Sequence, residues 1–284
     1  MHRERVSDNV YWFQSDVYAQ VTAGVIVGPK WSVLIDTLAL PEESNAIREY
    51  VEHTLQSKIR YVINTHYHAD HTWGNCFFPE AIIIAHTRCR DYLIERGVPA
   101  LKEAKQQNSM FKQVEIKLPD MTLDKGSMNL QIGKKHLEII PAPGHSDDGI
   151  AVLVVEDRVL FGGDAFMPIP YLPDGDPEDL RDFYETVRGM TLENVVQGHG
   201  EVILRGEVET TIAGNLDYLN TIEKIARTAL RRKSPMEYLA KQDIEKCGKS
   251  RILLGGIASA LHEQNLQYIY QKELKKEKAE VQKA

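Results

Sequence analysis

The pattern of apolar and polar positions predicts a chain that begins mainly with strands. Short segments rich in Val, Ile and aromatic residues are separated by turn residues or by polar stretches. The predicted strands of this half are 9–15, 21–27, 31–36, 61–64 and 81–85. Helices are expected where apolar residues recur every three or four positions, or where proline and acidic residues open a segment. These helices are 41–56, 88–96 and 99–111.

Strands return after Met121 and give way to helices near the end of the chain. The second group of predicted strands is 128–132, 137–141, 150–155, 158–161 and 194–196, with a helix at 177–188. Two strand-rich halves with helices between them suggest two sheets packed between helical layers. The remaining predicted helices are 208–230, 235–241 and 253–274. We therefore expect an α/β domain over residues 1–206 and a helical C-terminal extension, residues 207–284, packed on it.

Composition and charge exclude several classes of protein. The chain has 34 Lys and Arg against 41 Asp and Glu, a formal net charge of −7, which argues against a general nucleic-acid binder. The charged start precedes no signal-peptide core, and the aliphatic runs have only strand length, so we expect a cytoplasmic protein without membrane association. Three widely spaced cysteines form no CxxC pair, which excludes a disulfide scaffold or a cysteine-based zinc ribbon.

Ten histidines are distributed unevenly, and one short segment concentrates potential metal ligands. The run His66-x-His68-x-Asp70-His71 directly follows the predicted strand 61–64. His66 and His68 are two positions apart, so an extended backbone points both imidazoles to the same side. Imidazole and carboxylate are suitable ligands for Zn²⁺. The segment therefore predicts a metal site.

Three later residues have similar surroundings. His145, Asp164 and His199 each stand near the end of a predicted strand and next to glycine, which permits a tight turn beside a ligand. Taken in this order with the histidine-rich run, they make the chain resemble the metallo-β-lactamase-fold hydrolase superfamily. The resemblance extends over about residues 9–203.

This resemblance implies a four-layer αββα sandwich with a binuclear metal site at one edge. It implies two Zn²⁺, with iron or manganese as alternatives. The first metal would be bound by His66, His68 and His145, the second by Asp70, His71 and His199, with Asp164 bridging the two. Asp70 would also act in catalysis by orienting the nucleophile.

Details of the motifs narrow the branch of the superfamily. The bridging Asp164 is similar to that of glyoxalase II-like and lactonase-like enzymes, whereas zinc β-lactamases usually carry cysteine or serine there. His68 disfavours the diiron flavoproteins, which carry glutamate at that position. No segment corresponds to the additional domain of the RNA-processing branch. A mononuclear iron enzyme of the persulfide-dioxygenase type and a β-lactam-hydrolysing enzyme remain alternatives.

We therefore expect a hydrolase that uses a metal-bridging hydroxide to cleave a small ester, lactone, thioester or related small-molecule substrate. A homodimer is compatible with the sequence. Candidate pocket residues flank the metal loop, follow Asp164 in an apolar proline-rich segment, or lie on the last helix. They are Tyr67, Trp73, Met167, Tyr171 and His262. The alternatives are a rigid connector for the proline-rich segment and a surface or packing role for His262.

Overall fold

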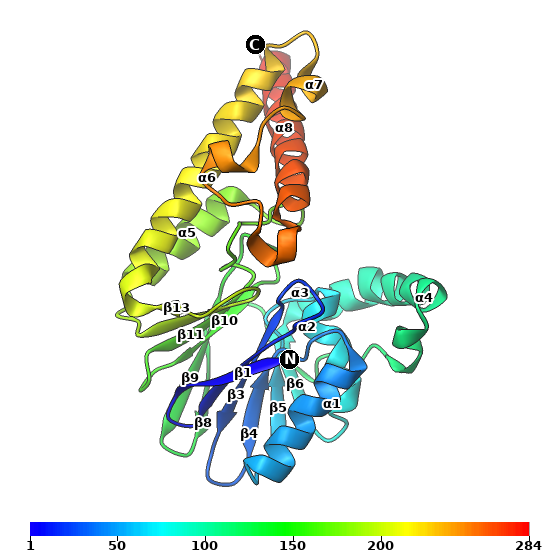
Figure 1. The fold of residues 1–284 in the computed structure, drawn as a ribbon, viewed down its shortest axis with the longest axis vertical. Helices are drawn as coiled ribbons and strands as arrows, with labels where there is room; N and C mark the ends of the chain where they lie inside the picture. The colour runs from blue at the N-terminus through cyan, green and yellow to red at the C-terminus, as the bar shows by residue number, and fades with distance from the viewer. Residues whose placement is uncertain (284) are drawn as a thin grey trace.

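Two β-sheets lie face to face in the computed structural model, which describes the backbone of residues 1–283 and the side chains of residues 1–279 (Figure 1). The first sheet follows chain order: β1 (His2–Ser7), β2 (Val10–Gln14), β3 (Thr22–Val27), β4 (Ser32–Ile35), β5 (Ile59–Ile63), β6 (Ile82–His86) and β7 (Met121–Leu123). Its pairs are antiparallel from β1 to β4 and parallel from β4 to β7.

The second sheet has a more complex order, because a crossover separates two of its neighbouring strands. From one edge to the other it consists of β13 (Ile203–Leu204), β12 (Asn194–Gln197), β11 (Val159–Gly163), β10 (Ile150–Val154), β9 (Lys135–Pro141) and β8 (Met128–Ile132). Strands β11 and β12 are parallel, with α5 between them in sequence, and the other pairs are antiparallel. This parallel pair places the ends of both strands at the same edge of the sheet.

Helices cover the outer faces of the two sheets (Figure 1). In the first half they are α1 (Pro41–Glu49) continued by η1 (Tyr50–Thr54), α2 (Ala69–Thr72), η2 (Trp73–Phe77), α3 (Thr87–Tyr92), η3 (Leu93–Gly97), α4 (Val98–Gln107) and η4 (Ser109–Gln113). In the second half they are α5 (Pro177–Arg188), η5 (Arg205–Glu207), α6 (Val208–Leu230), α7 (Pro235–Leu239), η6 (Ile244–Cys247), η7 (Leu253–Gly256) and α8 (Ala258–Lys283).

The alternation of side chains along the strands explains the layers. Within β3, Ile26 faces the second sheet and belongs to the core between the sheets, whereas Val25 faces the helix side and packs in a cluster with Ile47 of α1. On the other side, Leu160 of β11 shares a cluster with residues of α5, α6 and α8. The predicted four-layer αββα arrangement with C-terminal helices is confirmed.

Some elements differ from the sequence-based prediction. Segment His2–Ser7 forms the edge strand β1, although its charged residues predict no strand; an edge strand tolerates charge because solvent covers one of its sides. The last helix begins at Ala258 instead of Leu253, since Leu254, Gly255 and Gly256 have positive φ angles of 55°, 67° and 97°. Strands β7 and β13 are too short for an apolar pattern to reveal.

The helical extension packs on the second sheet and on α5. Helices α6 and α8 lie side by side and reach beyond the sandwich (Figure 1). Their apolar faces join the core of the second sheet in one continuous cluster. The division of the chain into two domains at residue 206 stays a prediction. Within residues 1–283, no helix combines the length and the apolar character that a bilayer span requires.

Candidate metal centre

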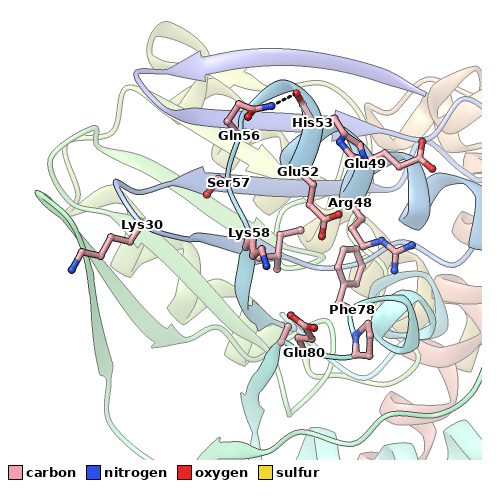
Figure 2. A pocket seen from close by; sticks show the side chains of 13 residues that line it. Lys30, Arg48, Glu49, Glu52, His53, Gln56, Ser57, Lys58, Phe78 and Glu80 are labelled. Carbon is pink, nitrogen blue, oxygen red and sulfur yellow. Dashed lines mark hydrogen bonds between the residues drawn. The ribbon is translucent and has the colours of Figure 1, made fainter.

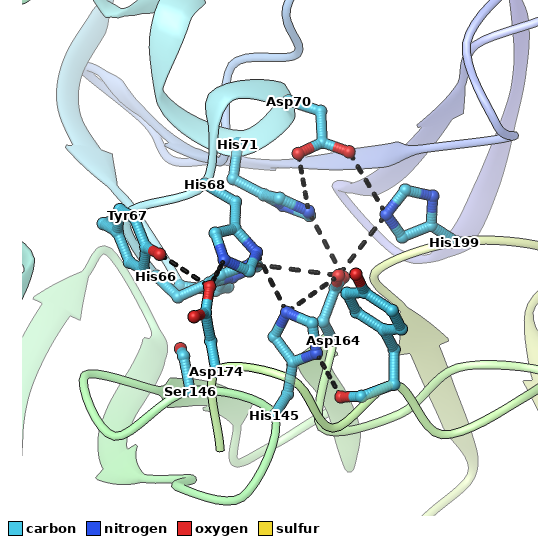
Figure 3. Close-up of polar contacts among 12 residues, drawn as sticks. His66, Tyr67, His68, Asp70, His71, His145, Ser146, Asp164, Asp174 and His199 are labelled. Carbon is cyan, nitrogen blue, oxygen red and sulfur yellow. Dashed lines mark hydrogen bonds and ion pairs between the residues drawn. The ribbon is translucent and has the colours of Figure 1, made fainter. Parts of the chain in front are cut away.

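Seven potential ligands meet at one edge of the sandwich, just beyond the ends of several strands (Figure 3). The loop after β5 and the short helix α2 supply the histidine-rich run, while single residues follow β9, β11 and β12. They are His66, His68, Asp70, His71, His145, Asp164 and His199. Residues that are separated by more than 130 positions in sequence therefore share one site, because the two sheets end at the same edge.

Two glycines permit this close approach. Gly163 has a φ of 51°, which favours glycine, and it turns the chain so that Asp164 follows β11 directly into the site. A Cβ atom on Gly198 would lie 1.9 Å from Oδ1 of Asp164, so a side chain there would displace that carboxylate. Gly163 thus permits the tight turn that the sequence predicted, whereas Gly198 permits the close approach of the chain to Asp164.

The ligand-type atoms form two groups with Asp164 between them. His66, His68, His145 and Asp164 make one group, and in each group the atoms lie within 4.8 Å of one another. The second group consists of Asp70, His71 and His199. Oδ2 of Asp164 lies 3.4 Å from Nε2 of both His145 and His199, and Oδ1 lies 3.2 Å from Nε2 of His71. Asp164 therefore contacts both groups.

Asp36, which the sequence analysis missed, orients one histidine from each group. Its Oδ2 accepts from Nδ1 of His71 at 2.9 Å and from the Thr65 hydroxyl at 2.7 Å. Since the Thr65 hydroxyl donates to Asp36, it accepts from Nδ1 of His66 at 3.1 Å. The sequence shows only that an acidic residue directly follows an apolar run, here strand β4. That pattern does not specify the partners of Asp36, which the structure shows to be buried.

The segment between β11 and α5, residues 165–176, orients two more ligands; we call it the connector. Nδ1 of His145 donates to the carbonyl oxygen of Tyr171 at 2.8 Å, and Nε2 of His68 donates to Oδ2 of Asp174 at 2.9 Å. The hydrogen bond from His68 holds the pKa of Asp174 well below its ordinary value. Asp174 is thus an anionic acceptor at neutral pH. It too was missed, because its distance from His68 is 106 positions in sequence.

All five histidines have an acceptor at the outer ring nitrogen; for His199 it is the carbonyl oxygen of Ala19, 2.8 Å from Nδ1. Burial lowers the pKa of His66 and His145, so the inner nitrogens of these two rings are lone pairs. Burial opposes the charged form of His71 and His199 too, but Asp164 and neighbouring acids outweigh it, raising the pKa of His71 well above its ordinary value and that of His199 to about 10. Nδ1 of His68 lies 3.0 Å from Nε2 of both His66 and His145, so three imidazole nitrogens converge on one point. Such a cluster of nitrogens fits a cation.

The second group also contains buried polar atoms without hydrogen-bond partners. Nε2 of His71 and Oδ1 of Asp164 are both buried, and neither has a hydrogen-bond partner among the described residues. Buried polar atoms are normally satisfied, and such exceptions call for an unseen partner. Together with the converging nitrogens of the first group, these atoms form a donor set that fits metal binding.

Burial and charge set the protonation of the site. Burial disfavours the charged imidazole and lowers the pKa of His145 to about 4 and that of His66 well below its ordinary value. Burial also opposes ionisation of Asp164, but the combined interactions with His199, His71 and His145 outweigh it and hold the carboxyl pKa well below its ordinary value. Neutral imidazoles and an ionised carboxylate are the forms that bind metals.

A cavity of about 440 Å³ opens onto these ligands. Met167 and Tyr171 of the connector line it, at the positions that the sequence analysis proposed for the pocket. Its other walls come from the loop after β2 and from the region where η7 meets α8. The helical extension therefore contributes directly to the surroundings of the metal centre, which the sequence analysis left open.

Three of the residues that the sequence analysis proposed for the pocket do not line this cavity. Tyr67 donates its hydroxyl to a carboxylate of the connector. Trp73 is buried against Phe111, with ring centroids 5.0 Å apart, because the short helical turn points it away from the ligands. His262 is buried within the helical extension, where Nδ1 lies 3.0 Å from the hydroxyl of Tyr218. His262 is therefore packed in the interior of the extension, as one of the alternatives proposed.

A second cavity, of about 690 Å³, lies near the opposite ends of the same strands (Figure 2). It adjoins the beginnings of β5 and β6, whereas the ligands follow the end of β5. Charges of both signs surround it, among them Arg48, Glu52, Lys58 and Glu80. None of the seven potential ligands lines this cavity, so its size does not make it a competing reaction centre.

Comparison with known proteins agrees with the fold. Residues 18–207 match the family model described as "Metallo-beta-lactamase superfamily". A beta-lactamase-like protein 2 homolog of Caenorhabditis elegans is 25% identical over 178 residues, which are 60% of this chain and 52% of that protein. A probable metallo-hydrolase of Methanocaldococcus jannaschii is 25% identical over 204 residues, which are 68% of this chain and 91% of that protein.

Solved structures show the same fold at lower identity. A metallo-beta-lactamase from Pontibacter korlensis is 18% identical, with a TM-score of 0.62 over 75% of this chain and 97% of its own. The sec-alkylsulfatase Pisa1 from Pseudomonas sp. is 16% identical, with a TM-score of 0.74 over 95% of this chain and 50% of its own. This chain thus spans about half the length of the nematode relative and of the sulfatase. By the family match over most of its length, the chain belongs to the metallo-beta-lactamase superfamily of metal-dependent hydrolases.

Proposed function

We propose that this protein is a binuclear zinc hydrolase that cleaves a small ester, lactone or thioester. The observation that carries the proposal is the position of Asp164, in contact with both groups of ligand-type atoms. Two bound Zn²⁺ would supply a hydroxide near neutral pH by lowering the pKa of a shared water, and would stabilise negative charge on the substrate oxygen.

The residues of the chain have two tasks in this reaction. The five histidines hold the metals as neutral ligands, since their outer nitrogens are fixed by acceptors. Asp70 lies at the cavity with Oδ2 3.3 Å from Nε2 of His199, where it accepts a hydrogen bond from the attacking water and orients it. A bond forms between the water oxygen and the carbonyl carbon, and the bond to the leaving oxygen or sulfur breaks. The leaving group takes one proton of the water, so the products are a carboxylic acid and an alcohol or thiol.

A mononuclear iron oxygenase of the persulfide-dioxygenase type is the competing proposal. One metal ion would occupy only one of the two groups and would leave Asp70, His71 and His199, or their counterparts, without a ligand function. The presence of both groups favours the hydrolase.

Metal analysis together with a substrate panel tests the proposal. We expect about two zinc ions per chain and turnover of at least one class among esters, lactones and thioesters, with β-lactams and sulfate esters included as comparison classes. One iron per chain with oxygen uptake on a persulfide would refute the hydrolase. If only β-lactams are cleaved, the proposed substrate class is wrong and β-lactams take its place. Cytoplasmic location and homodimer formation stay predictions.

A further inference from the structure

The cavity over the metal centre has walls that are mainly apolar and come from two distant parts of the chain. Val17 and Tyr18, in the loop after β2, form one side. Leu254, Ile257 and Leu261 form another, and they belong to the region where η7 meets α8. The cavity's volume, about 440 Å³, equals about fifteen water molecules at ~30 Å³ each, so it has room for more than a reacting carbonyl group.

Several of these apolar side chains are exposed at the rim. Val17 is 75% exposed, Ile257 is 42% exposed and Tyr18 is 40% exposed. Single exposed apolar residues are common, but exposed residues that gather around a cavity indicate a surface that an apolar ligand covers. The rim therefore points to a ligand that extends from the metal centre toward solvent.

The turn before α8 places residues at the start of this helix beside the cavity. Leu254 and the two following glycines have left-handed backbone conformations, which end η7 and let α8 start in a new direction. Ile257 directly precedes α8 and its carbonyl oxygen accepts from the backbone N–H of Leu261, four positions on, while Gln264 follows three positions later, so the three side chains share one side of the start of α8. All three line the cavity.

The charge of the walls disfavours an anionic tail on the ligand. Among the described residues that line the cavity, none is lysine or arginine. The charged side chains there belong to the metal centre, and the amide oxygen of Gln264 accepts from the hydroxyl of Tyr171 at 2.5 Å. A carboxylate or phosphate on the far part of a substrate would have to lose water without gaining a cationic partner.

We propose that the substrate is a neutral ester or lactone with an unbranched apolar chain, which lies between Val17 and the Ile257–Leu261 face of α8. This inference rests on the proposed hydrolase function. It makes the C-terminal extension the element that selects the substrate. Each methylene of the chain that is buried in the cavity stabilises the bound substrate. The usual free energy of burying one methylene corresponds to about a fourfold increase in kcat/KM per carbon until the cavity is filled.

A series of p-nitrophenyl esters from acetate to octanoate, assayed with the zinc-loaded full chain, tests the proposal. We expect kcat/KM to rise about two- to fourfold per methylene in the wild type. Ile257→Ser and Val17→Ser, both at exposed positions, should at least halve this slope. Ile252→Ser is the matched control, because Ile252 is 77% exposed on the same segment and does not line the cavity. A flat series in the wild type, or an equal loss of slope in the control, would overturn the proposal.

A charge comparison and a binding measurement complete the test. The p-nitrophenyl monoester of adipic acid, with its free carboxylate, should be turned over at least tenfold less efficiently than the hexanoate. Equal or better turnover of the anion would contradict the proposal. If no ester, lactone or thioester is cleaved, the hydrolase function fails, and calorimetry with octanamide and acetamide still decides the pocket. Tighter binding of octanamide supports the apolar pocket, and equal binding refutes it.

Discussion

The buried amide of Asn265 offers a direct test of how α8 supports the metal centre. Its Nδ2 donates to the carbonyl oxygen of Pro170 at 2.7 Å and to the hydroxyl of Tyr218 at 3.0 Å. Its Oδ1 accepts from the backbone N–H of Leu172 at 3.0 Å. These bonds fix the connector on both sides of Tyr171, the residue whose carbonyl oxygen accepts from a metal-site histidine.

The substitution Asn265→Ala removes all three hydrogen bonds at once. The backbone groups of Pro170 and Leu172 then lose their partners in a buried environment, at a cost of about 1–3 kcal/mol each. We therefore expect the free energy of unfolding to fall by about 2–6 kcal/mol. For a protein of this size that corresponds to a decrease in Tm of roughly 4–12 °C.

The same change should affect the two metal ions unequally. A displaced Tyr171 carbonyl no longer orients His145, and losing such an outer hydrogen bond typically costs 10- to 100-fold in metal affinity. The group of Asp70, His71 and His199 has its outer partners elsewhere and should keep its affinity.

Thermal unfolding followed by circular dichroism measures the stability, and a competition titration with a zinc chelator gives the two dissociation constants. Gln267→Ala is the control, because Gln267 is exposed on the same helix. The reasoning is refuted if Asn265→Ala melts within 1 °C of the wild type, or if both zinc ions are weakened equally.

Three further predictions follow from the site and its surroundings. His68→Ala and Asp164→Ala should each abolish hydrolysis and lower the zinc content below two per chain by mass spectrometry; full activity in either would disprove the ligand assignment. Asp174→Asn should weaken binding of one zinc by about tenfold in the chelator titration, because a neutral amide is a poorer acceptor for His68, and unchanged affinity would contradict this. Burial lowers the pKa of Lys249 to about 8 in the folded protein. Because this value lies below that of the unfolded chain, the penalty for the charged form is fully present below pH 8 and disappears as pH rises from about 8 to 10.5. The urea midpoint of the wild type should therefore rise relative to that of Lys249→Met between pH 7 and 9.5, and parallel midpoints would argue against it.

The sequence by itself predicted the candidate metal ligands and most of the sheets. His66, His68, Asp70 and His71 lie within six positions, so local backbone geometry alone brings them near one another. Strands buried on both faces are continuous apolar runs, and such runs are visible without knowledge of their partners. The later ligands could be recognised because each stands beside a glycine at the end of such a run.

Only the tertiary structure decided which groups surround these ligands. Asp36 and Asp174 act on histidines 35 and 106 positions away, and the carbonyl of Ala19 acts on His199 across 180 positions. A backbone carbonyl has no signature in the sequence at all, and a single acid resembles any other. Trp73 was misplaced for a related reason: proximity in sequence does not determine the direction of a side chain on a short helical turn. The apolar wall of the cavity likewise exists only because the turn at Leu254 brings α8 across the metal edge, a contact that depends on the packing of the whole extension.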